Sequence, residues 1–292
     1  MISVMLTNIK RLIKRMFPKW QADRLYKLNF GRFINWDHPT EFNEKLRCHQ
    51  FYSDTSKWSL LADKYRVRDY IKEKGYEEIL VKLYGVWDNA NDIDFSKLPD
   101  SFVLKTNHGC GSVYIIKDKH KANLEKIKQQ LNEDLKESYG IETAEPHYLK
   151  IKSVIIAEEL LCQDGSQSSS LIDYKFYCIY GEPQFCGVMY DRDITNRTYY
   201  VKLYDNDWKD ITQFLAKTAH AGTRDVPRPH NFDAMKEFCR KVCKEFPFVR
   251  MDFYESSGKL YFGEFTFTPA ACSGGSIGPE ASKLLADQIP NI

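Results

Sequence analysis

Residues 248–266 read FVRMDFYESSGKLYFGEFT. Aromatic and branched residues flank a short Ser-Ser-Gly segment, which predicts two antiparallel strands joined by a three-residue turn with Gly258 in the left-handed region. Such a turn would place Arg250 opposite Glu264 and Asp252 opposite Phe262. Alternate residues of a strand share a face, so we expect one face of this hairpin to carry Arg250, Asp252, Glu264 and Thr266.

Two carboxylates on one face of an apolar hairpin need a compensating charge. A buried carboxylate without a partner is costly, and a nearby cation or a bound metal removes that cost. Oxygen ligands from Asp252 and Glu264 suit magnesium that bridges nucleotide phosphates, with Arg250 beside it for a developing negative charge. The alternative interpretation is a structural salt bridge between Arg250 and Glu264.

Length and composition indicate a globular protein. The chain has 292 residues, of which 43% are hydrophobic and 14% aromatic, so we expect one large domain or two to three closely joined ones. Eight cysteines without a Cys-x-x-Cys pair argue against a zinc site and a disulfide framework. No apolar stretch is long enough to span a membrane and no secretory signal is evident, which predicts a cytoplasmic protein.

The amino-terminal segment is strongly basic. Residues 1–35 contain eight lysines and arginines against the single acid Asp23, a net charge of +7, which leaves −5 for the remainder. Apolar residues from Ile9 to Phe17 follow a helical period. This pattern indicates either peripheral contact with the inner face of an anionic membrane or with an acidic polymer, or a solvated helix. Nothing in it favours nucleic acid as a partner.

Helices and strands alternate along the chain without internal repeats. Helices are expected within residues 1–60, interrupted at Pro18 and Pro39, and at 62–74, 120–138 and 232–245. Strands are expected at 78–87, 101–105, 113–116, 154–157, 172–180 and 183–190, followed by an irregular region to Arg228. The many local hairpins favour the α+β class over a doubly wound parallel sheet.

Other polar residues stand at the ends of predicted strands. Lys105 ends a buried strand directly before a loop that contains Gly109 and Gly111, where backbone amides could approach a phosphate, although the Walker order is absent. Lys64 and Arg68 lie four residues apart on a predicted helix, a like-charge pair that is unfavourable unless an anion lies between them. Glu158-Glu159-Leu160-Leu161 follows another buried strand, and Asp173 and Lys175 alternate on the next one.

The order of these elements resembles the ATP-grasp superfamily, and most closely its teichuronopeptide-biosynthesis (TupA-like) branch, which is found with bacterial surface polysaccharide genes. The resemblance rests on PTEFNEK at residues 39–45, ADKYRVRDY at 62–70, YGVW at 84–87, FVLKTNHG at 102–109, DYKF at 173–176, FPFVRMD at 246–252 and FGEFT at 262–266. It implies an ATP-grasp fold, in which two α+β subdomains grip ATP, with a helical N-terminal extension. The implied domains are a helical basic region at 1–62 and an ATP-grasp unit at 63–292, with a flap-bearing subdomain at 101–157 and a metal-binding subdomain at 158–292.

The resemblance also implies a role for each matching residue. Magnesium would be held by Asp252 and Glu264, while Arg250, Lys105 and His108 would act in catalysis. ATP would be bound by Lys64, Lys105, Gly109, Gly111, Ser112, Glu158, Glu159, Leu161, Asp173 and Lys175. Within this set the lysines would hold phosphates, residues 158–161 the adenine, and Asp173 the ribose. The sequence departs from the family in two places. Many members have a metal-binding Asn where this chain has Thr266. Usual members also have an amino-terminal α/β domain for the acceptor substrate, whereas only about 60 residues precede Lys64 here.

The implied activity is an ADP-forming carboxylate–amine ligase of surface polysaccharide biosynthesis, such as capsule, O-antigen or a teichuronic-type polymer. It would join an amino acid to a uronic acid or another carboxylate-bearing sugar component through an acyl phosphate. One alternative is a metal-dependent glycosyltransferase, because Asp191-Arg192-Asp193 and Asp205-Asn206-Asp207 match a short motif that binds sugar-nucleotide metals. A sugar kinase on the same scaffold and a nucleotide-binding module without turnover are further alternatives.

Overall fold

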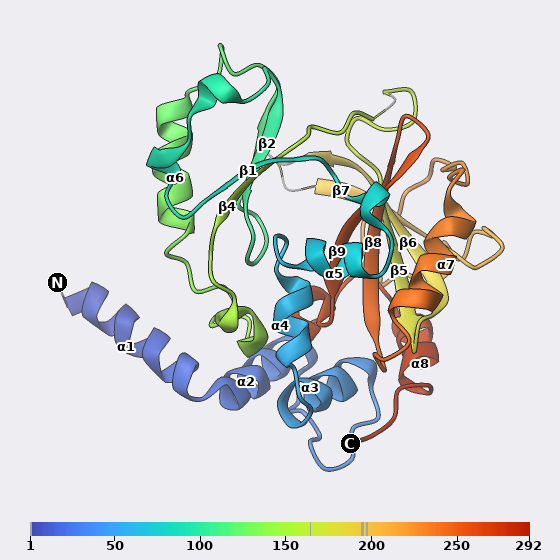
Figure 1. The fold of residues 1–292 in the computed structure, drawn as a ribbon. Helices are drawn as coiled ribbons and strands as arrows, with labels where there is room; N and C mark the ends of the chain where they lie inside the picture. The colour runs from blue at the N-terminus through green and yellow to red at the C-terminus, as the bar shows by residue number, and fades with distance from the viewer. Residues whose placement is uncertain (1, 164, 194–195, 197) are drawn as a thin grey trace. The chain divides into compact units, whose positions relative to one another are not determined.

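The structure is a computed structural model that describes residues 2–163, 165–193, 196 and 198–292, without the side chains of residues 2–5 and 8. The chain forms two compact units (Figure 1). The first comprises Met1–Pro18 and Thr55–Leu161, and the second comprises Lys19–Asp54 and Cys162–Ile292. The chain therefore passes from one unit to the other three times. The domain division expected from the sequence stays a prediction.

The first unit is built on a four-stranded antiparallel sheet with the strand order β1-β4-β2-β3. Its strands are β1 (Leu83–Trp87), β2 (Phe102–Thr106), β3 (Val113–Ile116) and β4 (Ile155–Glu158). Its helices are α1 (Ile2–Met16), α4 (Ser56–Ala62), α5 (Val67–Glu73) and α6 (Leu124–Asp134). Phe102 and Leu104 of β2 pack with Leu131 of α6 in one buried cluster, so the inward face of β2 holds α6 against the sheet.

The second unit is built on a five-stranded antiparallel sheet with the strand order β7-β6-β5-β8-β9. Its strands are β5 (Asp173–Ile179), β6 (Glu182–Asp193), β7 (Thr198–Tyr204), β8 (Val249–Ser256) and β9 (Lys259–Thr266). Its helices are α2 (Pro18–Phe30), α3 (Phe42–Tyr52), α7 (Phe232–Val242) and α8 (Pro279–Ala286). The mixture of helices and antiparallel sheets confirms the predicted α+β class.

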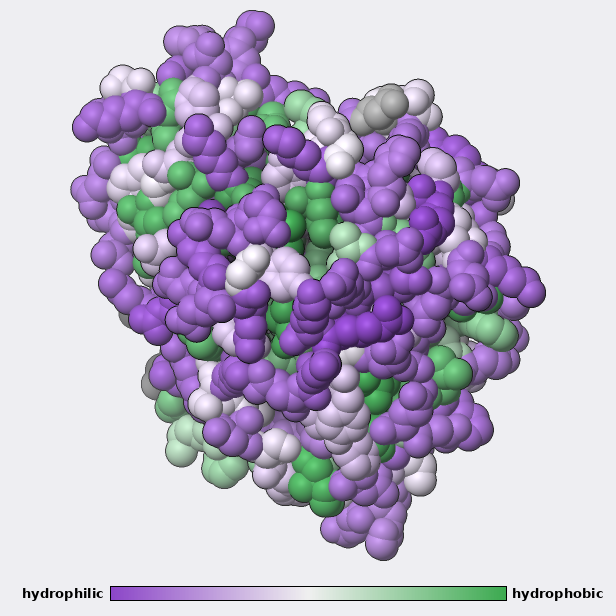
Figure 2. Space-filling view, turned by 45° about the vertical axis from the view of Figure 1, so that its right-hand side comes forward, coloured by the Kyte–Doolittle hydropathy of each residue, from purple (hydrophilic) through white to green (hydrophobic). Residues whose placement is uncertain are grey.

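Aromatic packing gives the two faces of the five-stranded sheet different roles. On one face, α7 runs along β5 and β6 (Figure 1), and Phe232 of α7 lies 5.4 Å from Phe176 of β5, measured between ring centroids. On the other face, Phe42 of α3 meets Phe248 at 4.9 Å in a cluster that also includes Leu285 of α8. The molecular surface outside these cores is mostly hydrophilic on the side that Figure 2 shows.

Four predicted elements differ from the structure, and one of them is the helix expected at 120–138, which spans only Leu124–Asp134. The helix expected at 62–74 begins only at Val67, because residues 64–66 form a turn that Asp63 caps. Residues 77–79 form a 3-10 turn, so β1 is shorter than the strand expected at 78–87. The region expected to be irregular contains β7, whose sequence TYYVKLY has the aromatic and β-branched residues of a strand. Among the described residues, no helix is long and apolar enough to cross a membrane.

Candidate functional site

Charged side chains gather on the face of the five-stranded sheet opposite α7, beside the apolar cluster that contains Phe248. Along β8, Met251 and Phe253 are fully buried, and Phe253 packs on Phe238 of α7. Alternation then turns Arg250 and Asp252 to the other face. Lys175 of β5 is the register partner of Asp252, so the charges of neighbouring strands meet.

Asp252 is the centre of this charged cluster. Its Oδ1 accepts a hydrogen bond from Arg250 Nε at 2.7 Å, and its Oδ2 accepts one from Arg250 Nη2 at 2.7 Å and one from Lys175 Nζ at 2.5 Å. Asp252 is only 1% exposed. Burial alone would raise the pKa of its carboxyl group, but the charges of Arg250 and Lys175 hold that pKa below its usual value. Asp252 is therefore ionised at neutral pH.

Glu264 lies next to Asp252 and is more accessible. Its Oε1 is 3.3 Å from Arg250 Nη2 and accepts a hydrogen bond from Thr266 Oγ1 at 3.2 Å. The side chain of Glu264 is 36% exposed, against 1% for that of Asp252. The salt bridge between Arg250 and Glu264 that was the alternative interpretation is thus present, and Arg250 pairs with Asp252 as well. The carboxylate of Asp252 is therefore buried in the sheet, whereas that of Glu264 is partly exposed to solvent.

The predicted register of the hairpin is wrong, although the predicted shared face is correct. Arg250 lies opposite Thr266 and Asp252 opposite Glu264. Within the turn only Ser257 and Gly258 have positive φ, at 51° and 75°, so the turn has two residues instead of three. That turn alone would put the two carboxylates on opposite faces. A bulge between Asp252 and Phe253 places Gly263 as an extra residue on β9 and restores the common face.

Asp173 extends the cluster along β5. It pairs with Arg192 of β6 at 2.5 Å, and its Oδ1 lies 3.5 Å from Lys175 Nζ. That Oδ1 is buried and accepts no hydrogen bond from the described residues. The charge of Asp173, together with burial, also raises the pKa of Tyr254 well above its usual value. A buried acceptor without a donor is expensive, so a ligand hydroxyl group would stabilise this position.

The oxygen donors of the sheet suit the predicted cofactors. Asp252 and Glu264 are adjacent carboxylates on paired strands, which is the ligand chemistry that magnesium prefers. The described residues contain no group of three or more His, Cys, Asp or Glu side chains arranged to hold a metal. Magnesium at this position would therefore take its remaining ligands from phosphates and water, as it usually does when it accompanies a nucleotide.

In the first unit, the predicted site residues Lys105 and Glu158 form an ion pair. Lys105 Nζ lies 2.5 Å from Glu158 Oε2, and Arg68 Nη1 lies 3.3 Å from Glu158 Oε1. Arg68 also donates to the carbonyl of Val81 at 2.8 Å. We expected an anion near the like-charge pair Lys64 and Arg68, and Glu158 is the anion that contacts Arg68. It does not lie between Arg68 and Lys64, because Lys64 precedes α5 and donates to the carbonyl of Gly109 at 2.6 Å.

The loop between β2 and β3 contains the predicted flap residues. Asn107 fixes its start, because its side chain donates to Asp63 at 2.8 Å and accepts from the backbone of Val154 at 2.7 Å. His108 is buried with its Nε2 at 3.0 Å from the carbonyl of Glu137, and burial lowers its pKa. The structure thus holds His108 through a contact with Glu137, which lies outside this loop. Asn107 was not predicted, although a polar residue directly after a buried strand was a signal for it.

The glycines of this loop differ in their surroundings. A Cβ atom on Gly109 would lie 2.4 Å from the ring of Tyr139, so this position requires glycine. Gly111 has a φ of +97° and nothing within 4 Å of the position that a Cβ atom would occupy, so its requirement comes from the backbone conformation. Ser112 accepts a hydrogen bond through its carbonyl from the backbone of Thr106 at 3.3 Å, which closes the loop.

The predicted hinge lies where the chain leaves the first unit. Glu158 ends β4, and the backbone of Glu159 donates to the carbonyl of Lys82 at 2.9 Å. Leu161 is the last residue of the first unit. Residues 159–161 are half-buried and follow the end of β4.

A cavity of about 300 Å³ adjoins the charged cluster within the second unit. Lys175 and Arg250 line one part of it, and the segment Gly274–Ile277 lines another. The cavity also contains apolar side chains of β6 and β7 and residues of a loop; they are Met189, Tyr199, Val201, Leu203, Thr218, Ala219 and His220. Sequence reasoning missed this cavity because its walls come from segments that are far apart in the chain.

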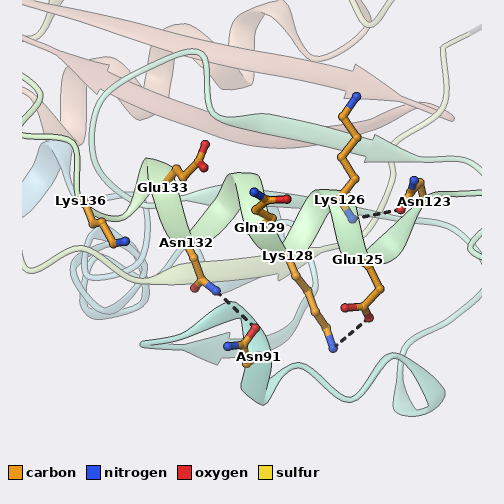
Figure 3. A pocket seen from close by; sticks show the side chains of 9 residues that line it. All are labelled: Asn91, Asn123, Glu125, Lys126, Lys128, Gln129, Asn132, Glu133 and Lys136. Atoms are coloured by element: carbon orange, nitrogen blue, oxygen red, sulfur yellow. Dashed lines mark hydrogen bonds and ion pairs between the residues drawn. The ribbon is translucent and has the colours of Figure 1, made fainter.

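A second depression, of about 560 Å³, lies on α6 in the first unit (Figure 3). Its side chains are polar, and two pairs of them interact: Lys128 lies 3.7 Å from Glu125, and Asn132 donates to Asn91 at 3.4 Å. None of the predicted site residues lines it. We therefore assign no functional role to it.

The two Asp-x-Asp triplets have structural partners. Asp191 accepts from the backbone of Ser169 at 2.8 Å and pairs with Arg224 at 3.0 Å. Asp205 accepts from the backbone of Asp207 at 2.9 Å and of Lys209 at 2.8 Å, which closes a turn. The triplets thus stabilise loops, and this geometry does not favour the glycosyltransferase alternative.

The chain is similar to several solved structures. It is 16% identical to the D-alanine–D-alanine ligase from Bacillus anthracis, with a TM-score of 0.46 over 79% of this chain and 66% of that one. It is 11% identical to the L-amino acid ligase from Bacillus licheniformis, with a TM-score of 0.42 over 83% and 52% of the two chains. For the ATP-grasp ligase PsnB, also 11% identical, the TM-score is 0.45 over 82% and 62%. The chain thus spans between about half and two thirds of the length of these ligases.

The sequence comparisons are more specific. No curated protein matches the sequence significantly. A family model matches residues 44–289, which include every predicted site residue from Lys64 to Glu264, and its description is TupA-like ATP-grasp.

Proposed function

The chain belongs to the TupA-like ATP-grasp family, and on this premise we propose that it is an ATP-dependent carboxylate–amine ligase. The observation that carries this proposal is the charged face of the five-stranded sheet. There Asp252 and Glu264 lie side by side, with Arg250 in contact with both. Such a cluster combines groups that bind a metal with a cation that stabilises developing negative charge.

Both units carry groups whose chemistry suits a nucleotide. In the second unit, Asp252 and Glu264 would hold magnesium, which when bound would neutralise phosphate charge. The buried Oδ1 of Asp173, which accepts no hydrogen bond from the described residues, supports a contact with a ribose hydroxyl. In the first unit, Lys105 would exchange part of its contact with Glu158 for a phosphate, and the backbone at 159–161 would meet the adenine. Arg250 would stabilise charge on the acyl phosphate.

The carboxylate substrate would enter the cavity beside Arg250 and Lys175. Its two cations suit a carboxylate, and the glycines of the segment Gly274–Ile277 leave backbone groups accessible on the opposite side. A volume of about 300 Å³ is at the lower end for small-ligand sites, which supports a single sugar or amino-acid unit. A uronic acid or another carboxylate-bearing component of a surface polysaccharide, with an amino acid as the amine, fits this size and charge.

Interception of the activated carboxylate tests the reaction class. We expect the protein, ATP, magnesium and a uronic acid to yield a hydroxamate when hydroxylamine replaces the amine, with one ADP for each hydroxamate. Glu264→Gln should suppress this product by at least about tenfold, because it removes a metal ligand that is accessible and whose loss leaves the sheet intact. Glu237→Gln, an exposed carboxylate of α7 that pairs with Lys241, is the matched control.

The kinase alternative makes the opposite prediction. It shares the nucleotide site but transfers phosphate to a hydroxyl group, so a stable phosphorylated sugar would accumulate with ADP and without any need for an amine. Mass spectrometry that finds this product and no hydroxamate would contradict the ligase proposal and leave the family unchanged.

A further inference from the structure

Helix α1 presents an apolar stripe on its surface. Leu6, Ile9, Leu12, Ile13 and Met16 recur at spacings of three and four residues, which places them on one side of a helix. Their exposed fractions lie between 42% and 63%. Apolar side chains of this size are usually buried, so a continuous exposed row of them marks a surface that another body covers.

The remaining surface of α1 is basic. Lys10, Arg11, Lys14 and Arg15 lie within the same helix, which contains no acidic residue between Ile2 and Met16 and has a net charge of +4. At 100° per residue, Lys10 and Lys14 follow one border of the apolar stripe. Lys14 also contacts Glu142 of the same unit, which ties the helix to the unit through one of its four charges.

We propose that α1 binds in the plane of an anionic lipid bilayer, with the apolar stripe among the lipid chains and the basic residues at the headgroups. An interfacial helix of this kind is recognised by its apolar face, its Lys and Arg residues on the polar face and its low overall hydrophobicity. Fifteen helical residues extend about 22 Å, which is too short for the hydrocarbon core of about 30 Å. The helix therefore lies on the membrane and does not cross it.

Charge complementarity favours lipid over a second copy of this chain as the occupant. Two copies of α1 packed through their apolar stripes would bring together two helices of charge +4, with no acidic residue on either helix to compensate. An anionic bilayer offers the opposite charge together with an apolar interior. Each basic residue near such a surface strengthens binding by about fivefold, and added salt weakens the attraction.

Flotation of the full chain with lipid vesicles tests the proposal. We expect binding to vesicles of equal parts phosphatidylcholine and phosphatidylglycerol, and little binding to phosphatidylcholine alone. Ile9→Ser with Ile13→Ser should weaken binding by at least about tenfold, because both side chains leave the stripe. Lys10→Gln with Arg11→Gln should weaken it by roughly 25-fold at low salt, and by less as salt rises.

Lys126→Gln with Lys136→Gln is the matched control, because it removes two exposed lysines in and just after α6 of the same unit. An unchanged melting temperature in every variant shows that the fold is intact. The proposal is overturned if the unaltered chain does not float with anionic vesicles, or if the control weakens binding as much as the α1 variants do. Analytical ultracentrifugation without lipid tests whether a second copy covers the stripe. If the unaltered chain is a dimer and the Ile9→Ser/Ile13→Ser variant is a monomer, the stripe is a dimer interface and the proposal is overturned.

Discussion

Asp252 is both a stabilising residue and a proposed metal ligand. Its two oxygens accept three hydrogen bonds from Arg250 and Lys175, and Asp252 itself is buried. Removal of one partner from a buried ion pair costs about 3–5 kcal/mol, because the other charges stay behind without compensation. Loss of activity in an Asp252 variant is therefore ambiguous, whereas the more accessible Glu264 tests the metal without this penalty.

The pH dependence of folding should reveal the ionised state of Asp252. Its pKa is lowered in the folded protein from an ordinary value of 3.8, so its charge stabilises the fold above that pH and the contribution disappears as the pH falls through the lower folded value. We expect Asp252→Asn to lower the free energy of unfolding by about 3–5 kcal/mol at neutral pH. The difference in free energy of unfolding between this variant and the unaltered protein should shrink when the pH falls below 3.8, the ordinary pKa of an aspartate.

Urea unfolding at a series of pH values measures this effect. Asp92→Asn, at an exposed position of the first unit, is the control and should follow the unaltered protein throughout. A constant gap between Asp252→Asn and the unaltered protein down to strongly acidic pH would mean that Asp252 is not ionised in the fold.

At the scale of the element, the hairpin of β8 and β9 depends on two compensating irregularities. The two-residue turn shifts the pairing by one residue, and the bulge at Gly263 shifts it by one more. The sequence indicated the hairpin and its charged residues, and a glycine inside a strand was a signal for the bulge. The register itself could not be predicted, because Ser256-Ser257-Gly258 is compatible with both turn lengths and each assigns different partners.

Alanine at Gly263 should separate fold stability from site assembly. A Cβ atom there would lie 2.7 Å from the carbonyl oxygen of Asp252, which is closer than such atoms approach. We expect Gly263→Ala to lower the free energy of unfolding by about 1–3 kcal/mol. It should also reduce ATP turnover, because β9 must move away from the strand that carries Asp252.

Gly258→Asn in the same hairpin is the matched control. Gly258 has a φ of +75° and open space around it, and asparagine tolerates that backbone conformation. The control should keep its activity. If Gly263→Ala retains full turnover, the common face of the two carboxylates does not depend on the bulge.

The ion pair between Lys105 and Glu158 in the first unit could not be predicted from the sequence. Lys105 and Glu158 were both recognised, but as separate phosphate and adenine contacts, and the structure joins them in an ion pair that also includes Arg68. A sequence reports which residues end neighbouring strands. It does not report that β4 lies between β1 and β2, which is the arrangement that brings Glu158 to Lys105.

For the whole molecule, nucleotide binding should appear as thermal stabilisation. A ligand at 100 times its Kd adds about 2.7 kcal/mol, which raises the melting temperature of a protein of this size by roughly 5 °C. We expect this rise with ATP or ADP and magnesium, and not with UDP-glucose. Lys105→Gln should reduce it, whereas Lys121→Gln, an exposed lysine of the same unit, should not. A rise with UDP-glucose alone would restore the glycosyltransferase alternative.

The interleaving of the two units has a consequence for synthesis on the ribosome. Residues 19–54 leave the ribosome early, but Phe42 packs on Phe248, and Lys45 donates to the carbonyls of Ala286 and Ile289. More than a hundred residues of the other unit are translated in between. At about 5–20 residues per second, α3 therefore waits roughly ten seconds or longer with its apolar side uncovered. Nascent chains of this protein should accordingly bind a holdase chaperone from the emergence of α3 until the release of α8.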